Sequence, residues 1–97
     1  MADYVVLIDY TDQGIRTIEG SAERAEVFRE TAKKVGVEVK ELYWTSGVHD
    51  GVLILEAPDD RAVSALMLSL VRAGNVRTQT LRAYGPSEMR EILDARP

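Results

Sequence analysis

Two β-like runs joined by a short polar turn lie in the middle of the chain, between Tyr43 and Ala57. The turn spans residues 46–50 and contains the only histidine, His49. The run that follows, residues 51–57, has apolar residues at consecutive positions, which is typical of a central strand covered on both faces. The pattern predicts a β-hairpin at the middle of a small domain.

The segments around the hairpin alternate between strand-like and helical patterns. Further strands are expected at residues 4–10, 37–45 and 76–84, helices at about 22–35 and between Pro58 and Gly74, and a short closing helix after Gly85. In the first helix Ser21 is the expected cap, Arg24 is expected on the polar side, and Gly36 is the expected stop. A change of apolar parity in the second strand predicts a β-bulge near Lys40 and Glu41. Residues 11–20 are expected to form an ordered loop that two isoleucines pin to the protein body.

The order β-α-β-β-α-β with a final helix predicts the α+β, ferredoxin-like fold. In this fold two helices cover one face of a four-stranded antiparallel sheet. Residues 1–97 are expected to form a single domain of this type. Its other sheet face would be apolar and bare, which is a liability in a monomer. We therefore expect a homodimer, or a higher homo-oligomer, in which a second sheet covers this face.

Composition excludes several classes of function. The formal net charge is −4 and no basic run is present, so nucleic acid is not an expected partner. The absence of cysteine excludes disulfides and thiolate-bound metals or clusters. No run is apolar enough to span a bilayer and the N-terminus does not resemble a signal peptide, so a cytoplasmic protein is expected. No cofactor or metal site is predicted, since the aspartates stand at no ligand-like spacing.

Four stretches together resemble the GYD domain family over nearly the whole chain: residues 43–45, 47–50, 55–60 and 74–78. The resemblance implies a ferredoxin-like subunit that associates as a dimeric α/β-barrel, and it implies no particular activity. The family pattern has a tyrosine immediately before Asp50, where this chain has His49. A function that needs a phenol at that position is therefore not expected.

His49 is the first candidate for proton transfer, because its ordinary pKa is near neutrality. Adjacent Asp50 could orient a ligand or another side chain. The structural alternative is favoured, in which His49 ends the hairpin and Asp50 satisfies the amides of the turn.

The remaining candidates are ligand-binding residues. Tyr43 and Trp44 could line an apolar pocket for a small organic ligand, although a lone tryptophan is more often a core or interface residue. Arg77, Thr78 and Arg82 could hold an anion, or they could decorate an edge strand with polar groups that prevent further pairing.

Two functions follow from these candidates. The first is a homodimeric module that binds a small organic ligand or serves assembly, with its sheet faces packed together. The alternative is a cofactor-independent enzyme, similar to the oxygenases or isomerases of other dimeric α/β-barrel families. In that alternative His49 would be the acid or base, and Arg77 or Arg82 would anchor an anionic substrate.

Overall fold

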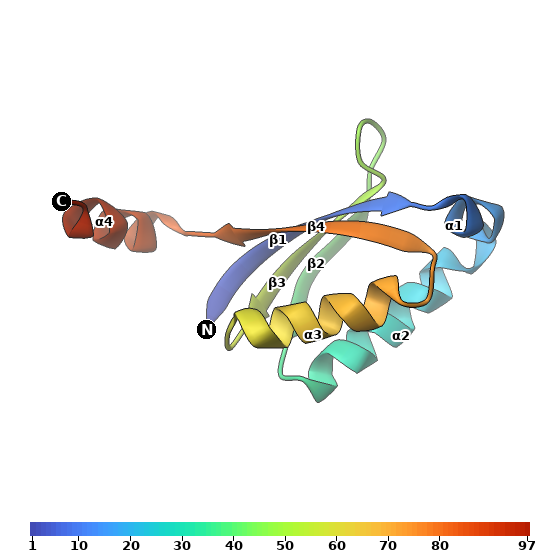
Figure 1. The fold of residues 1–97 in the computed structure, drawn as a ribbon, viewed down its shortest axis with the longest axis horizontal. Helices are drawn as coiled ribbons and strands as arrows, with labels where there is room; N and C mark the ends of the chain where they lie inside the picture. The colour runs from blue at the N-terminus through green and yellow to red at the C-terminus, as the bar shows by residue number, and fades with distance from the viewer.

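The computed structural model describes all 97 residues. The chain forms four strands, four α-helices and one 3-10 turn, joined by loops (Figure 1). The elements are, in order, β1 (Ala2–Tyr10), α1 (Asp12–Arg16), η1 (Ile18–Gly20), α2 (Ser21–Lys34), β2 (Glu38–Trp44), β3 (Gly51–Ala57), α3 (Asp60–Val71), β4 (Val76–Ala83) and α4 (Pro86–Ala95). None of the helices is both long enough and apolar enough to span a bilayer.

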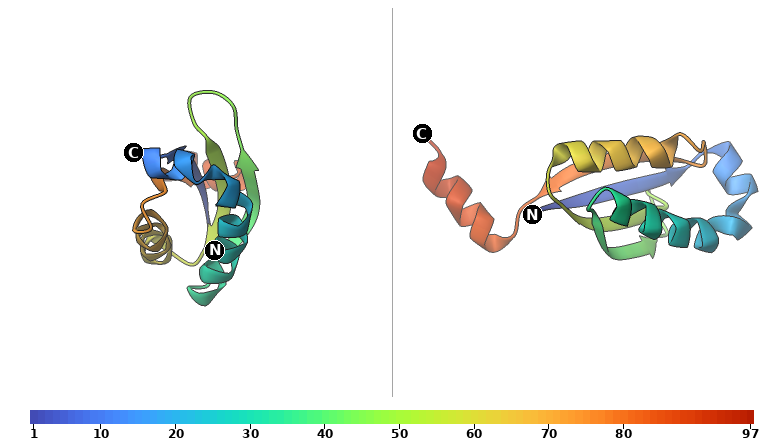
Figure 2. Two further views of the ribbon diagram at one scale, coloured as in Figure 1. Left: turned by 90° about the vertical axis from the view of Figure 1, so that its right-hand side faces the viewer. Right: turned by 90° about the horizontal axis from the view of Figure 1, so that it is seen from below.

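The strands form one antiparallel sheet in the order β2-β3-β1-β4, with β1 and β3 at its centre. Helices α2 and α3 lie side by side across one face of this sheet (Figures 1 and 2). This arrangement confirms the predicted α+β, ferredoxin-like fold. The central position of β1 and β3 agrees with their high apolar content, because central strands have a neighbouring strand on both sides and are less accessible to water than edge strands.

The core lies between the sheet and the two helices. Successive residues of β3 alternate between buried and partly exposed, so that Leu53 and Leu55 face the helices while Val52 and Ile54 face away. Phe28 of α2 and Leu66 of α3 meet these side chains from the helix layer. A fully buried leucine contributes about 1.5–3 kcal/mol relative to an exposed one, so this layer is the main stabilising contact of the chain.

The opposite sheet face, which we call the open face, has no covering element in this chain (Figure 2). The strand register places a cluster of apolar side chains on this face: Val5, Leu7, Val52, Ile54 and Leu81. The first and third strands are thus apolar on both faces as predicted, but the chain itself covers only one of those faces.

The predicted bulge is present in β2. The pairing of β2 with β3 shifts register between Val39 and Glu41, close to where the change of apolar parity indicated it. After the shift, Leu42 and Trp44 lie on the helix side of the sheet, whereas Tyr43 lies on the open face with its cross-strand partner Val52.

The prediction of a loop at residues 11–20 was wrong. This segment forms α1 and η1, and Thr11 caps α1 by accepting a hydrogen bond from the amide of Gly14. The two isoleucines that were expected to pin the segment are largely exposed, with Ile15 at 53% and Ile18 at 43%. Short turns of this kind are missed because five residues carry too little periodicity to read.

Two helix boundaries follow ordinary capping chemistry, whereas the predicted cap of α2 was wrong. Asp59 caps α3 by accepting from the amide of Ala62 at 3.0 Å, and Gly36 follows α2 with a φ of +75°, which favours glycine. Ser21 is not the cap of α2. It is the first helical residue, Gly20 precedes it, and no side chain caps this helix.

The C-terminal helix α4 does not close the fold, contrary to expectation. It extends away from the sheet and from α2 and α3 (Figures 1 and 2). An ion pair at its base joins Arg82 of β4 to Glu88, with 3.1 Å between nitrogen and oxygen. Met89, Ile92 and Leu93 are each 40–45% exposed and share one helix face. The apolar periodicity predicted the helix correctly but did not specify what it packs against.

Candidate functional site

A cavity of about 360 Å³ lies between the sheet and the helices, near the ends of β1 and β2. Its walls are mostly apolar, with Leu42 and Leu53 from the sheet, Phe28 from α2, and Leu66 and Leu70 from α3. This size and lining are typical of pockets for small organic molecules.

A chain of hydrogen bonds joins two strands and α2 at one wall of the cavity. The indole nitrogen of Trp44 donates to the hydroxyl oxygen of Tyr10 at 2.9 Å. That hydroxyl also shares a short hydrogen bond with Ser21 at the start of α2. All three residues line the cavity. The polar edge of the only tryptophan is therefore held in place by Tyr10, which orients its ring against the cavity.

Asp50 lines the cavity as well and closes the hairpin against β1. Its carboxylate accepts a hydrogen bond from the amide of Tyr10 at 2.8 Å, and its own amide donates to the carbonyl of Ile8 at 2.8 Å. The carboxylate thus satisfies a backbone amide, although in β1 and not within the turn. Asp50 holds the β1 end of the pocket in place.

Arg24 is the only cationic side chain that lines the cavity. One guanidinium nitrogen, Nη1, donates to the carbonyl of Thr17 at 2.9 Å. The other, Nη2, is buried and has no hydrogen-bond partner, the one such side-chain atom in the structure. Arg24 lies outside the apolar stripe of α2, as expected, but it is partly buried and lines the cavity.

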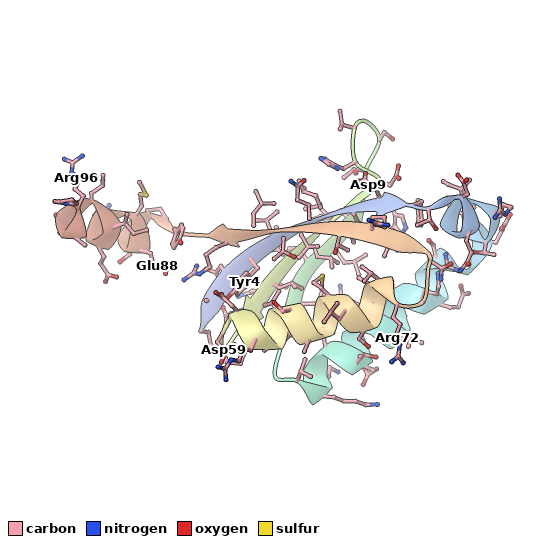
Figure 3. All side chains as sticks on the ribbon, viewed as in Figure 1. Tyr4, Asp9, Asp59, Arg72, Glu88 and Arg96 are labelled. Atoms are coloured by element: carbon pink, nitrogen blue, oxygen red, sulfur yellow. The ribbon has the colours of Figure 1, made fainter.

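His49 is not part of the cavity. Its Nδ1 lies 3.2 Å from both carboxylate oxygens of Asp9, and its side chain is one-third exposed. Asp9 lies near the end of β1, beneath the hairpin loop (Figure 3), and its cross-strand partner is Arg77. The pair therefore sits at the rim of the open face, away from Trp44 and its cavity, and catalysis by His49 stays a prediction.

The other sequence candidates divide between the two sheet faces. Tyr43 is among the cavity-lining residues, although its cross-strand partner Val52 places its side chain on the open face. Its hydroxyl donates to Glu41 at 2.9 Å. This bond and the carboxylate charge raise the pKa of Tyr43. Exposed Arg77 has Asp9 as its cross-strand partner at one end of the open face, whereas Thr78 lines a shallow groove between β4 and α3. The structure therefore does not gather these three residues around one ligand.

Arg82 lies at the far end of β4 from Arg77, roughly 16 Å away along the strand. Its guanidinium pairs with Glu88 and stacks 4.5 Å from the ring centre of Tyr84. Partial burial, the largest single effect, lowers the pKa of Arg82. The hydrogen bond to Glu88 and the charges of Glu88, Tyr84 and Tyr4 together outweigh it, so that the pKa is raised. With these partners in place, Arg82 ties α4 to the sheet and does not face the cavity.

Three cavity residues were missed by sequence reasoning: Tyr10, Ser21 and Arg24. A signal for two of them was present, because Ser21, Arg24 and Phe28 follow one another at helical spacing and therefore share a helix face. Nothing in the sequence indicated that Tyr10 would meet Ser21. The structure contains no cluster of three or more acidic or histidine side chains that could hold a metal ion.

Three solved structures share the fold of this chain at low sequence identity. MtbAldR matches with a TM-score of 0.67 and 13% identity, over 87% of this chain and 52% of MtbAldR, so the chain spans about half the length of that protein. TTHA0845 from Thermus thermophilus matches with a TM-score of 0.55 and 22% identity, over 88% of this chain and 95% of that one. FFRP-DM1 matches with a TM-score of 0.55 and 19% identity, over 87% and 100% of the two chains.

At the level of sequence, residues 4–93 match the family model described as the GYD domain. The match includes the hairpin, all the cavity residues and most of α4. No curated protein matches the sequence.

Proposed function

We propose that this chain, which belongs to the GYD domain family, is a homodimeric module that binds a small organic ligand. In the dimer the open faces of two sheets pack against each other. The ligand occupies the cavity between the sheet and its helices. The uncovered apolar open face is the observation that carries the proposal.

The composition of the open face supports self-association. Val5, Leu7, Val52 and Ile54 form an apolar centre on the two middle strands, and Leu81 extends it to β4 with 44% exposure. Contiguous apolar surface of this kind is rare on monomers and marks an interface. A second copy presents the same surface, so a two-fold arrangement covers both open faces at once.

Helix α4 adds a second uncovered apolar surface on the same chain. An isolated ten-residue helix is marginal in water, and α4 presents Met89, Ile92 and Leu93 without a covering element. Because α4 extends past the edge of its own subunit (Figure 1), a second copy packed on the open face is the partner within its reach. We assign its apolar face to that contact.

Sedimentation of the full chain tests the dimer. We expect a species of twice the 10.8 kDa chain mass at micromolar concentration. A monomer at the same concentration, with the open face still free, would overturn the proposal. The measurement should include high salt, since an interface built on apolar burial persists when surface charges are screened.

The enzyme alternative has less support. His49 and the cavity lie apart, and Arg82 is occupied by Glu88, so the proposed acid or base and one proposed anion anchor do not share a site. Only Arg77 lies near the pair of His49 and Asp9. A binding role therefore needs fewer rearrangements than a catalytic one.

A further inference from the structure

The hydrogen bonds among Tyr10, Ser21 and Trp44 leave one of their three donor hydrogens unused. The indole nitrogen of Trp44 donates to the oxygen of Tyr10, which occupies one lone pair. The two hydroxyl groups of Tyr10 and Ser21 carry two hydrogens, and only one of these can lie between the two oxygens. Whichever group donates, the other hydroxyl hydrogen has no acceptor among the bonds of the structure. An acceptor on a ligand would use it.

Arg24 supplies a second unused donor at the same end of the cavity. Ser21 and Arg24 are three residues apart in α2 and therefore lie on the same helix face. The Nη2 atom of Arg24 is buried without a partner, while Nη1 is held by Thr17. Because protein atoms cover Nη2, it reaches an acceptor on a ligand only when the guanidinium turns toward the cavity that Arg24 lines. The cost of leaving a charged donor unpaired favours that turn.

Two carboxylates, those of Asp50 and Glu23, also line the cavity. The Asp50 carboxylate already accepts from the amide of Tyr10 at 2.8 Å, and Glu23 is an exposed residue in the first turn of α2. The N-terminus of this 14-residue helix has no side-chain cap, and its dipole favours a negative group nearby. The remaining wall is mostly apolar and includes Phe28, Leu42, Leu66 and Leu70.

We propose that the cavity binds a small carboxylate with an apolar body. The carboxylate lies at the Ser21 and Arg24 end, and the apolar body lies against Phe28, Leu42 and Leu66. This inference rests on the proposed ligand-binding function and specifies its ligand class. The volume of about 360 Å³ limits the ligand to a compact molecule.

The test compares three probes that share one chain length, hexanoate, hexanol and hexylamine, by titration into the full-length protein. The fluorescence of Trp44, the single tryptophan, reports occupancy because its ring lines the cavity. We expect hexanoate to bind about 10- to 100-fold more tightly than hexanol, which is the range for a hydrogen bond to a charged group. Arg24→Met should remove this difference, and Ser21→Ala should reduce it.

Lys34→Met is the matched control. It removes one positive charge from an exposed position of the same helix, away from the cavity, and should leave hexanoate binding unchanged. Thermal unfolding without ligand should show Arg24→Met at least as stable as the parent chain, because the variant no longer buries an unpaired donor. If Arg24→Met does not fold, Ser21→Ala still provides the test, because this variant should reduce the preference for hexanoate over hexanol.

The possible failures are distinguishable. Equal binding of hexanoate and hexanol would overturn the carboxylate inference and leave the cavity as an apolar ligand site. Tighter binding of hexylamine than of hexanoate would overturn it, because the carboxylates of Glu23 and Asp50 would then determine the ligand charge. If none of the three probes binds, the ligand-binding function proposed for this cavity fails as well.

Discussion

The hydroxyl group of Tyr4 donates a hydrogen bond to the carboxylate of Asp60, joining β1 to the first turn of α3. Tyr4 is a core residue at 4% exposure, so this bond connects the sheet to a helix 56 residues later in the chain. The hydrogen bond, burial and the nearby carboxylate charge raise the pKa of Tyr4 to about 12.

Tyr4→Phe should lower the free energy of unfolding by about 1.5–3 kcal/mol at pH 8, because it removes a hydrogen bond to a charged acceptor. The raised pKa of Tyr4 stabilises the fold fully below pH 10, and this contribution is lost as the pH rises through 12. The difference between the parent chain and the variant should therefore shrink across that range in urea unfolding. Tyr43→Phe is the control for burial: it removes a similar bond to Glu41 from a tyrosine that is 54% exposed, and should cost much less. A pH-independent difference at Tyr4 would contradict the assignment.

Gly14→Ala should destabilise the fold by about 1–3 kcal/mol, the usual cost of overpacking. A Cβ atom at this position would lie 2.0 Å from the carbonyl oxygen of Asn75, so the α3–β4 loop would have to move. Gly85→Ala is the matched control, since nothing lies within 4 Å of a Cβ there. Equal melting temperatures for the two variants would show that the loop yields freely.

Asp59→Ala should cost about 1 kcal/mol, because it removes the side chain that caps α3. Asp12→Ala removes an acidic residue from the first turn of α1, where Thr11 already provides the cap, and should cost less. Chemical denaturation of both variants measures the difference. The prediction fails if Asp12→Ala proves the more damaging of the two.

Leu81→Glu should shift the chain from dimer to monomer without unfolding it. Leu81 is 44% exposed in one chain, so a glutamate there is tolerated by the monomer but becomes buried when two open faces meet. Leu68→Glu places the same charge on α3, at a residue 68% exposed on the helix layer, and should leave the dimer intact. Sedimentation of both variants, with circular dichroism to verify folding, gives the answer. Dissociation by Leu68→Glu alone would relocate the interface to the helices.

Removing residues 86–97 should weaken self-association while leaving a folded core. No buried core residue comes from α4, so the sheet and its two helices keep their packing. If the apolar face of α4 packs on the second copy, its loss raises the dimer dissociation constant. An unchanged dissociation constant would remove α4 from the interface.

Local patterns were sufficient for most of the elements. The strands and the two long helices appear within one or two residues of the predicted bounds, and the bulge in β2 was predicted from a change of apolar parity. These features could be read because side-chain period and turn chemistry act over a few neighbouring residues. Residues 11–20 escaped the same reasoning, since α1 and η1 are too short to display a period.

The sequence by itself determined the ferredoxin-like order of strands and helices and the presence of an apolar face on each side of the sheet. Only the tertiary structure decided which side chains meet: His49 lies against Asp9, and Trp44 bonds to Tyr10. It also placed Arg24 at a cavity that no motif had indicated. The physical reason is that periodicity specifies the face on which a side chain lies, whereas a contact between residues far apart in sequence depends on strand register and on how the helices are seated on the sheet.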